Sequence, residues 1–394
     1  MKIKLIGGIV LSLLIFQKVK AQENTIESKE EESFLTLKYN EKKAFKPNIA
    51  LEIWGTYNLH NKNTDEKNNR FDVSLRRFRF GASGSPYSWL SYSFQFHADR
   101  LGEDNYAFTK GSYGGIDIWN AYITVKLLKE SELLNVHAGY YWAAIGRQFN
   151  TSPWAVGSFD KTRAGWFLRS FITGKGNGIE SGVGVGGLIN FNNFGISYRV
   201  GTYEPKAYAT DENSSRLYTG RVMFSFGIPE QKKYSYMLSG NQWGKRTGVT
   251  VGLGISNQNN GKLTDTIIWK NSMAYGTDVL INFKGLRIDG EYYLMKRTAK
   301  KMDDFDGSEF HVQAGYDIPL KNTFLEPSFT YEKYLGKGNT TLFKYIGDDV
   351  TYDMGINWYL TEQKVKLSLH YVMQEGSISA ALGDFLGMAF QIKI

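Results

Sequence analysis

Apolar and polar residues alternate along much of this chain, and the alternation returns at intervals of about twenty residues. Residues 90–99, LSYSFQFHAD, alternate without a break, and residues 119–127 follow the same pattern. Successive side chains of a β-strand point to opposite faces of a sheet, so each such strand has one apolar and one polar face. A long series of them predicts a barrel with lipid outside and water inside. The expected lipid face includes Phe94, Phe96, Ile123, Val125 and Val136.

Seventeen segments show this strand pattern, whereas single-chain bacterial barrels have even strand numbers. We therefore predict an all-β, transmembrane, antiparallel up-and-down β-barrel of about 16 strands, with 18 as the alternative, over residues 49–394. The polar residues 22–48 are expected to form a flexible periplasmic segment, with a short helix in the barrel mouth as the alternative. The strands are expected to begin near Ile49, Phe71, Trp89, Ile116, Leu134, Ile179, Phe194, Tyr218, Tyr234, Val249, Ile267, Leu286, Phe310, Phe324, Thr351, Val365 and Phe385.

The first residues have the features of a signal peptide. Lys2 and Lys4 precede an apolar run over residues 5–16, and Val19 and Ala21 are small residues at the −3 and −1 positions of a cleavage site. The run is too short to cross a bilayer as a helix. Residues 1–21 are therefore expected to direct export and to be removed, with a retained anchor as the alternative.

Composition supports a barrel rather than a helical membrane protein. Aromatic residues make up 15% of the chain, the mean hydropathy is −0.36, and there is no cysteine. Tyr and Trp favour membrane interfaces. The net charge is +8, and four of these charges are leader lysines, so the mature charge of +4 gives no reason to expect nucleic acid as a partner. The Gly-rich residues 182–187 lack the ending of a phosphate-binding loop, and no cofactor is expected.

One long stretch, between Trp142 and Ile179, interrupts the strand pattern. Loops of this length are usually functional or disordered, and the aromatic and glycine residues of this one indicate packing. Residues 143–176 are therefore expected to fold into the lumen as a constriction, with an extracellular loop over the rim as the alternative. The only acid of the segment is Asp160, and its basic residues are Arg147, Lys161, Arg163, Arg169 and Lys175.

Three arginines near the start of the barrel are expected to face water. The parity of the apolar residues changes between Leu75 and Phe78, so a β-bulge would keep the apolar face continuous. Arg76, Arg77 and Arg79 then point into the lumen, because arginine on the lipid face costs ~2–4 kcal/mol near the midplane.

Fixed positive charges in a lumen raise the local concentration of anions and select against cations. The expected pore-lining, anion-binding residues are Arg76, Arg77, Arg79, Arg147, Lys161, Arg163, Arg169, Arg199 and Arg221. In the alternative, the arginines pair with lumen acids, brace a wide barrel and leave only weak selectivity. The acids available for such pairing are Glu180, Asp278, Asp289, Glu291 and Asp317.

Five segments in order resemble the phosphate-selective porin O and P family, in the branch common among Bacteroidetes-like bacteria. They are FDVSLRRFRFGASG, LRIDGEYYLMKR, EFHVQAGYDI, LEPSFTY and GINWYLTEQKVKLSLHY. The resemblance covers residues 49–394 and implies a homotrimeric, sixteen-stranded barrel that passes small anions such as phosphate. Two features depart from the family: the basic residues are fewer than in its arginine ladder and lysine cluster, and the chain ends in Ile394 rather than Phe.

Together these observations favour an anion-preferring porin in the outer membrane of a Gram-negative bacterium, through which small hydrophilic solutes diffuse passively. An enzyme needs a nucleophile and a base within hydrogen-bond reach, and no clustered Ser/His or paired-acid motif is visible. A lipase-type or protease-type barrel enzyme and a plugged structural or adhesin barrel are the alternatives. The five histidines are scattered and are expected to be structural rather than metal ligands; they are His60, His97, His137, His311 and His370.

Overall fold

The computed structural model describes residues 36–39, 42–59, 70–99, 115–205, 215–238, 240–264, 267–299, 302–378 and 383–394. The expected signal peptide, residues 1–21, lies outside the described residues, as do most of the expected flexible segment 22–48 and His60. None of the helices in the described part of the chain has the length and apolarity needed to cross a membrane.

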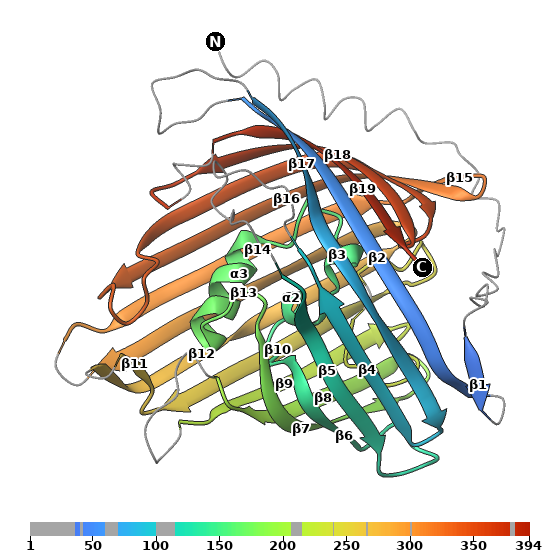
Figure 1. Cartoon of the computed structure of the whole chain (residues 1–394), viewed down its shortest axis with the longest axis horizontal. Helices are drawn as coiled ribbons and strands as arrows, with labels where there is room; N and C mark the ends of the chain where they lie inside the picture. Colours follow the sequence, from blue (N-terminus) through green and yellow to red (C-terminus); the bar gives the residue numbers. More distant parts are fainter. Residues whose placement is uncertain are drawn as a thin grey trace. The chain divides into compact units, whose positions relative to one another are not determined.

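Sixteen strands of the described chain close into an antiparallel β-barrel. The ring closes where β19 pairs with β2, from Phe385 opposite Asn58 to Lys393 opposite Ala50, so that red β19 lies beside blue β2 in Figure 1. The strands of the ring are β2 (Lys42–Asn58), β3 (Arg70–Tyr87), β4 (Leu90–His97), β5 (Asp117–Lys126), β6 (Asn135–Trp142), β7 (Ile179–Asn190), β8 (Phe194–Tyr203), β9 (Leu217–Gly227), β10 (Gly248–Asn259), β12 (Ile267–Phe283), β13 (Leu286–Ala299), β14 (Phe305–Tyr316), β16 (Thr323–Gly338), β17 (Gly347–Thr361), β18 (Val365–Glu375) and β19 (Phe385–Lys393). Three short strands extend hairpins at the edge of the ring: β1 (Leu37–Tyr39), β11 (Lys262–Thr264) and β15 (Ile318–Leu320).

The strand number of sixteen is confirmed, and the surplus candidate near Tyr234 is wrong. The described residues of segment 228–247 hold no strand. The Lys-Tyr-Ser-Tyr alternation there imitates a strand, but its tyrosines bond to groups inside the barrel instead of joining a sheet. At the N-terminal side of the barrel, β2 begins at Lys42 rather than at Ile49. Residues 42–48, which were expected to belong to the flexible segment, are therefore part of the wall.

The two rims of the barrel differ in the length of their connections. Tight turns at 88–89, 284–285 and 362–364 lie on one rim, called here the short-turn rim, where β2 starts and β19 ends. The other, called the long-loop rim, carries the connections 98–116, 143–178 and 204–216. Short turns on one side and long loops on the other are typical of outer-membrane barrels. Segment 228–247 is the exception, because it is long and starts from the short-turn rim.

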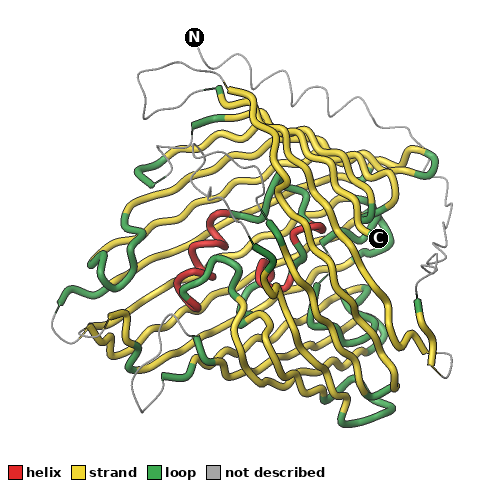
Figure 2. The backbone as a smooth tube through the Cα atoms, in the orientation of Figure 1, coloured by secondary structure: helices red, strands yellow, loops and turns green. Residues whose placement is uncertain are grey.

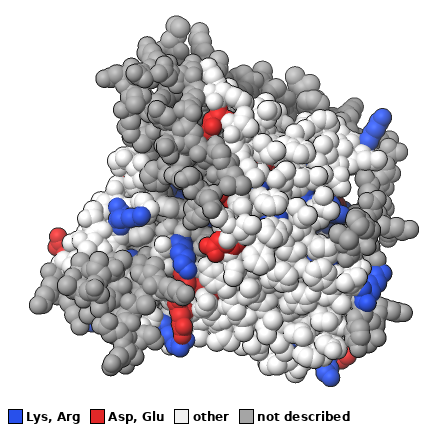
Figure 3. All heavy atoms as spheres, in the orientation of Figure 1, with Lys and Arg blue, Asp and Glu red and all other residues white. Residues whose placement is uncertain are grey.

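The outward and inward faces follow the predicted alternation. Phe94 and Ile123 are exposed on the outside of the wall, whereas Gln95 hydrogen-bonds inward to Asn48 and Asn120. Figure 3 shows a broad area without charged residues over part of the described outer wall. The predicted bulge in β3 is also confirmed: Arg77 pairs with Glu52 while Leu75 pairs with the next residue, so Arg76 is the extra residue.

A charge at the middle of the wall should cost more than the same charge at a rim. Leu253 lies midway along β10 and faces outward, and Ile228 lies just beyond β9 at the short-turn rim. We expect Leu253→Arg to lower the free energy of unfolding in bilayers by about 2–4 kcal/mol and Ile228→Arg by about 0–1 kcal/mol. Urea titrations of the two variants measure the difference, and equal costs would contradict the assigned lipid face.

Candidate functional site

The segment between β6 and β7 folds into the lumen, as the sequence predicts. It contains α2 (Arg147–Asn150), a 3₁₀ turn at Pro153–Ala155 and α3 (Arg163–Thr173), drawn in red within the ring of strands in Figure 2. Its backbone is held by acids of the opposite wall: Phe159 N–H donates to Asp353 at 2.6 Å and Ala164 N–H donates to Glu332 at 3.1 Å. We call residues 143–178 the inserted segment.

Local sequence features explain α3 and the close fit of the inserted segment. Thr162 caps the helix by accepting from Gly165 N–H, and Gly174 ends it with a left-handed φ of 77°. At the wall, a Cβ at Gly254 would lie 2.0 Å from the carbonyl oxygen of Ile145. Only glycine allows the backbone of the inserted segment to approach the wall so closely at this point.

A second segment, residues 228–247, enters from the short-turn rim and meets the first. Leu238 N–H donates to the Asn150 carbonyl at 2.8 Å, and the Asn150 side chain donates to the Tyr236 carbonyl at 2.9 Å. Arg147 forms a two-point ion pair with Glu230, at 2.7 and 2.9 Å. The alternation of residues did not predict this contact, although the length of the segment between Gly227 and Gly248 was a visible signal.

One part of the lumen is filled by an aromatic cluster around Arg297 of β13. The Arg297 guanidinium is fully buried and lies 4.3 Å from the Phe171 ring centre and 4.1 Å from that of Trp269. Phe343, from the connection between β16 and β17, packs edge-on against Phe171. This cluster fastens the end of α3 to the wall.

Polar side chains that keep contact with solvent remain beside β3–β5 and around the start of α3. The Asp160 side chain is 28% exposed, against 4% for its partner Arg77. Arg76, His97 and Asp99 are also partly exposed. Water therefore has more access to this side of the inserted segment than to the aromatic cluster.

The three arginines of β3 point into the lumen, but each is paired with an acid. Arg76 binds Asp160 at 2.7 Å, and Arg77 binds both Asp160 and Glu52. Burial alone would favour the neutral acid, yet the two guanidiniums hold the pKa of Asp160 well below its usual range. Arg79 binds Asp99 at 2.9 Å and stacks on the indole ring of Trp119 in β5.

The other expected anion-binding residues divide into two groups. Arg147, Arg163 and Arg221 pair with the acids Glu230, Asp349 and Asp278. Lys161, Arg169 and Arg199 have no ion pair with an acid in the described part of the chain. They donate instead to the carbonyl oxygens of Gln148, Gly176 and Ser235. The alternative of paired arginines therefore describes six of the nine positions.

Lys161 differs from the guanidinium groups because its charge can titrate. Burial lowers the pKa of Lys161 well below its usual range, and the neighbouring Arg169 lowers it further. The side chain lies in the inserted segment and is half-buried. Its charge is therefore present at low pH and is lost as the pH rises.

Three comparisons place the chain among known proteins. The sequence model of the family described as phosphate-selective porin O and P matches residues 48–386. No curated protein matches the chain significantly.

Solved outer-membrane proteins share the fold at low sequence identity. OprB of Pseudomonas putida is 11% identical with a TM-score of 0.58, covering 89% of this chain and 94% of that one. An anion-selective porin from Comamonas acidovorans is 13% identical, with a TM-score of 0.52 and coverage of 89% and 98%. The trimer form of OmpT, an outer membrane protein of Vibrio cholerae, is 12% identical, with a TM-score of 0.53 and coverage of 89% and 99%.

Removing one partner of the buried Arg77–Glu52 pair should cost more than removing both. We expect Arg77→Gln to lower the free energy of unfolding by about 3–5 kcal/mol, because it leaves the Glu52 carboxylate buried beside an uncharged group. The double variant Arg77→Gln with Glu52→Gln should recover part of that loss. Urea unfolding of the two single variants and the double variant measures the coupling; strictly additive costs would mean that the two side chains do not stabilise each other.

Proposed function

The chain belongs to the phosphate-selective porin O and P family and is an outer-membrane porin, and we propose that small hydrophilic solutes diffuse through it passively with a preference for anions, phosphate or a similar ion. One observation carries the preference: Lys161, Arg169 and Arg199 bond to carbonyl oxygens and have no acidic partner among the described residues. None of the three charges is held in an ion pair, although Lys161 and Arg169 lie near the buried carboxylate of Glu291. The part of their charge that is not shared with this acid, together with the charge of Arg199, raises the potential of the lumen.

We propose that the permeation route runs between the inserted segment and the wall of β3–β5. The partial exposure of Arg76 and Asp160 supports this route, and the buried aromatic cluster around Arg297 argues against a route on that side. The preference for anions should be moderate, because the arginines of β3 face Glu52, Asp99 and Asp160.

The assembly and export of the chain complete the proposal. A homotrimer is supported by the family and by the trimer form of one structural neighbour. Residues 1–21 would serve as a cleaved signal peptide, and the residues from 22 to the start of β2 as a periplasmic segment.

A plugged structural barrel is the second candidate, favoured by the contact between the inserted segment and segment 228–247 inside the lumen. A barrel enzyme has less support. In the Asp353–His370 pair, the second ring nitrogen of the histidine faces Asn357 at 3.2 Å, where a catalytic triad would need a hydroxyl.

The selectivity should depend on Lys161. In planar bilayers with a KCl gradient, the reversal potential should indicate anion preference, which should weaken as the pH rises and the Lys161 ammonium loses its proton. Lys161→Gln should shift the reversal potential toward cations and remove most of the pH dependence, with the largest effect in dilute salt, since the Debye length is about 10 Å at 0.1 M.

The matched control is Lys129→Gln, because Lys129 is an exposed lysine in the turn between β5 and β6. This variant should behave as the wild type does. A wild-type channel that prefers cations at every pH would refute the anion preference and leave the porin fold intact.

The size of the pore should depend on the inserted segment. Replacing residues 158–174 by a flexible Gly-Ser linker removes α3 from the lumen, and single-channel conductance should rise. Heat-modifiable migration on gels verifies that the variant has formed a barrel. Unchanged conductance in such a folded variant would mean that the inserted segment lies outside the route of the ions.

A further inference from the structure

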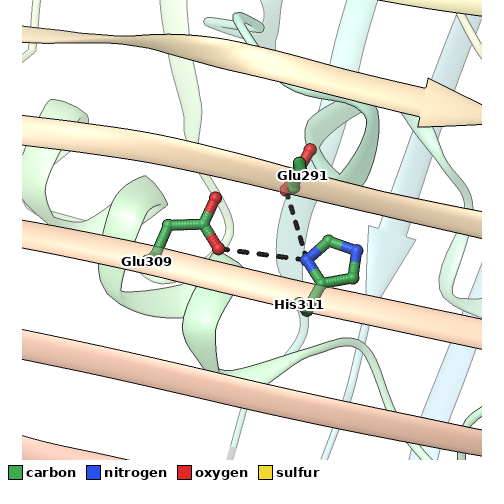
Figure 4. Close-up of side chains that lie close together, drawn as sticks. All are labelled: Glu291, Glu309 and His311. Atoms are coloured by element: carbon green, nitrogen blue, oxygen red, sulfur yellow. Dashed lines mark ion pairs between the residues drawn. The ribbon is translucent and has the colours of Figure 1, made fainter.

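We propose that Glu291, Glu309 and His311 form a binding site for one first-row divalent transition-metal ion, such as Zn²⁺, which joins the barrel wall to the inserted segment. The site lies on β13 and β14, whereas the proposed permeation route follows β3–β5, and metal binding goes beyond the proposed function. Figure 4 shows the three side chains directed toward one another from two neighbouring strands.

The strand register brings the three residues together. Glu291 of β13 pairs with His311 of β14, and Glu309 lies two residues before His311 on the same face. All three side chains are buried, with exposures of 3%, 0% and 0%. One potential ligand atom from each lies within 4.8 Å of the other two.

The distances leave a gap among the three groups. His311 Nδ1 lies 3.9 Å from Glu291 Oε1 and 3.9 Å from Glu309 Oε2, which is too long for hydrogen bonds. Among the described residues, His311 Nδ1, Glu291 Oε1 and both carboxylate oxygens of Glu309 have no hydrogen-bond partner. Burying polar atoms without hydrogen-bond partners is costly, and one cation in the gap would bind these free atoms of all three side chains.

The spacing and the donor types fit a transition metal. Zinc–nitrogen and zinc–oxygen bonds are about 2.0–2.2 Å long, so two ligand atoms 3.9 Å apart need only a small approach to bind the same ion. One imidazole with two carboxylates suits zinc, manganese or iron, whereas magnesium and calcium favour oxygen ligands alone.

Gln148 of α2 orients the site from the inserted segment. Its backbone N–H donates to Glu291 Oε2 at 3.2 Å, and its side-chain amide lies 3.5 Å from His311 Nε2. In the structure the amide nitrogen faces Nε2 and the amide oxygen has no hydrogen-bond partner among the described residues. Turning the amide by 180° would let its oxygen accept from Nε2–H, which gives the histidine the tautomer whose Nδ1 lone pair points at the two glutamates. An ion bound by the wall residues would therefore also hold α2 in place.

The charges around the gap also favour a cation. Glu332 of β16 lies opposite His311, which adds a third carboxylate to Glu291 and Glu309. The basic groups near these acids are Arg169 and Lys161 of the inserted segment and Arg221 of the wall, and Arg221 pairs with Asp278. The three carboxylates exceed the two remaining basic groups by one negative charge, which favours a cation in the gap.

The test uses the full-length protein, folded in detergent, treated with EDTA and then given ZnSO₄. Elemental analysis after desalting should find one zinc per chain, and zinc should raise the wild-type Tm by about 5 °C or more, whereas MgSO₄ should not. Glu309→Gln and His311→Gln should each lose the bound zinc and the shift in Tm.

The matched control is Asp353→Asn. Asp353 and His370 are also a buried acid–histidine pair in the lumen, but they touch at 2.5 Å and leave no room for an ion, so this variant should still bind one zinc. A wild-type protein that binds no zinc would overturn the proposal even if the variants fail to fold. Zinc binding that survives in both Glu309→Gln and His311→Gln would overturn it as well. Conductance is not part of the readout, so failure of the metal site and failure of the porin function are distinguishable.

Discussion

The absence of hydrogen-bond partners in the hydrocarbon core of a membrane governs this structure. Every backbone N–H and C=O of a wall strand must find its partner within the barrel. The pairing of β19 with β2 meets this demand at the last open edges, from Phe385 to Lys393. Closing sixteen strands in this way leaves a lumen that the side chains of the wall do not fill. The inserted segment and segment 228–247 occupy part of that space.

The need to pair buried charges explains most of the lumen. A charge in this partly dry interior is costly unless an opposite charge or a hydrogen-bonding group meets it. Arg77 illustrates the rule, since it binds an acid of the wall, Glu52, and an acid of the inserted segment, Asp160. Ion pairs of this kind fasten the inserted segment to the wall and at the same time reduce the charge available for selectivity. The proposed preference for anions would then depend on Lys161, Arg169 and Arg199.

Local patterns in the sequence predicted the features that depend on local geometry. The period of two predicted the strands and their outward faces, and the change of parity after Leu75 predicted the bulge at Arg76. The strand expected near Tyr234 was wrong because alternation alone does not reveal whether a neighbouring strand is available for pairing. The inserted segment was predicted from its length and composition, whereas its partners in the wall depend on tertiary packing.

The acid–histidine cluster is another feature that local sequence patterns could not predict in full. Glu309 and His311 are visibly on one face of a strand, but Glu291 joins them only through the register of β13 with β14, which the sequence pattern did not specify. Histidines counted one by one along the chain therefore looked scattered. Contacts between strands, rather than residue types, decide which polar groups of a barrel meet.

Two segments enter the lumen, and we propose that they narrow it without sealing it. Conductance of the purified wild-type protein in planar bilayers distinguishes an open pore from a plugged one. We expect discrete, stable current steps in symmetrical KCl, which scale with salt concentration. A correctly folded, heat-modifiable barrel that inserts into the bilayer and carries no current would contradict it, and would identify the two segments as a plug.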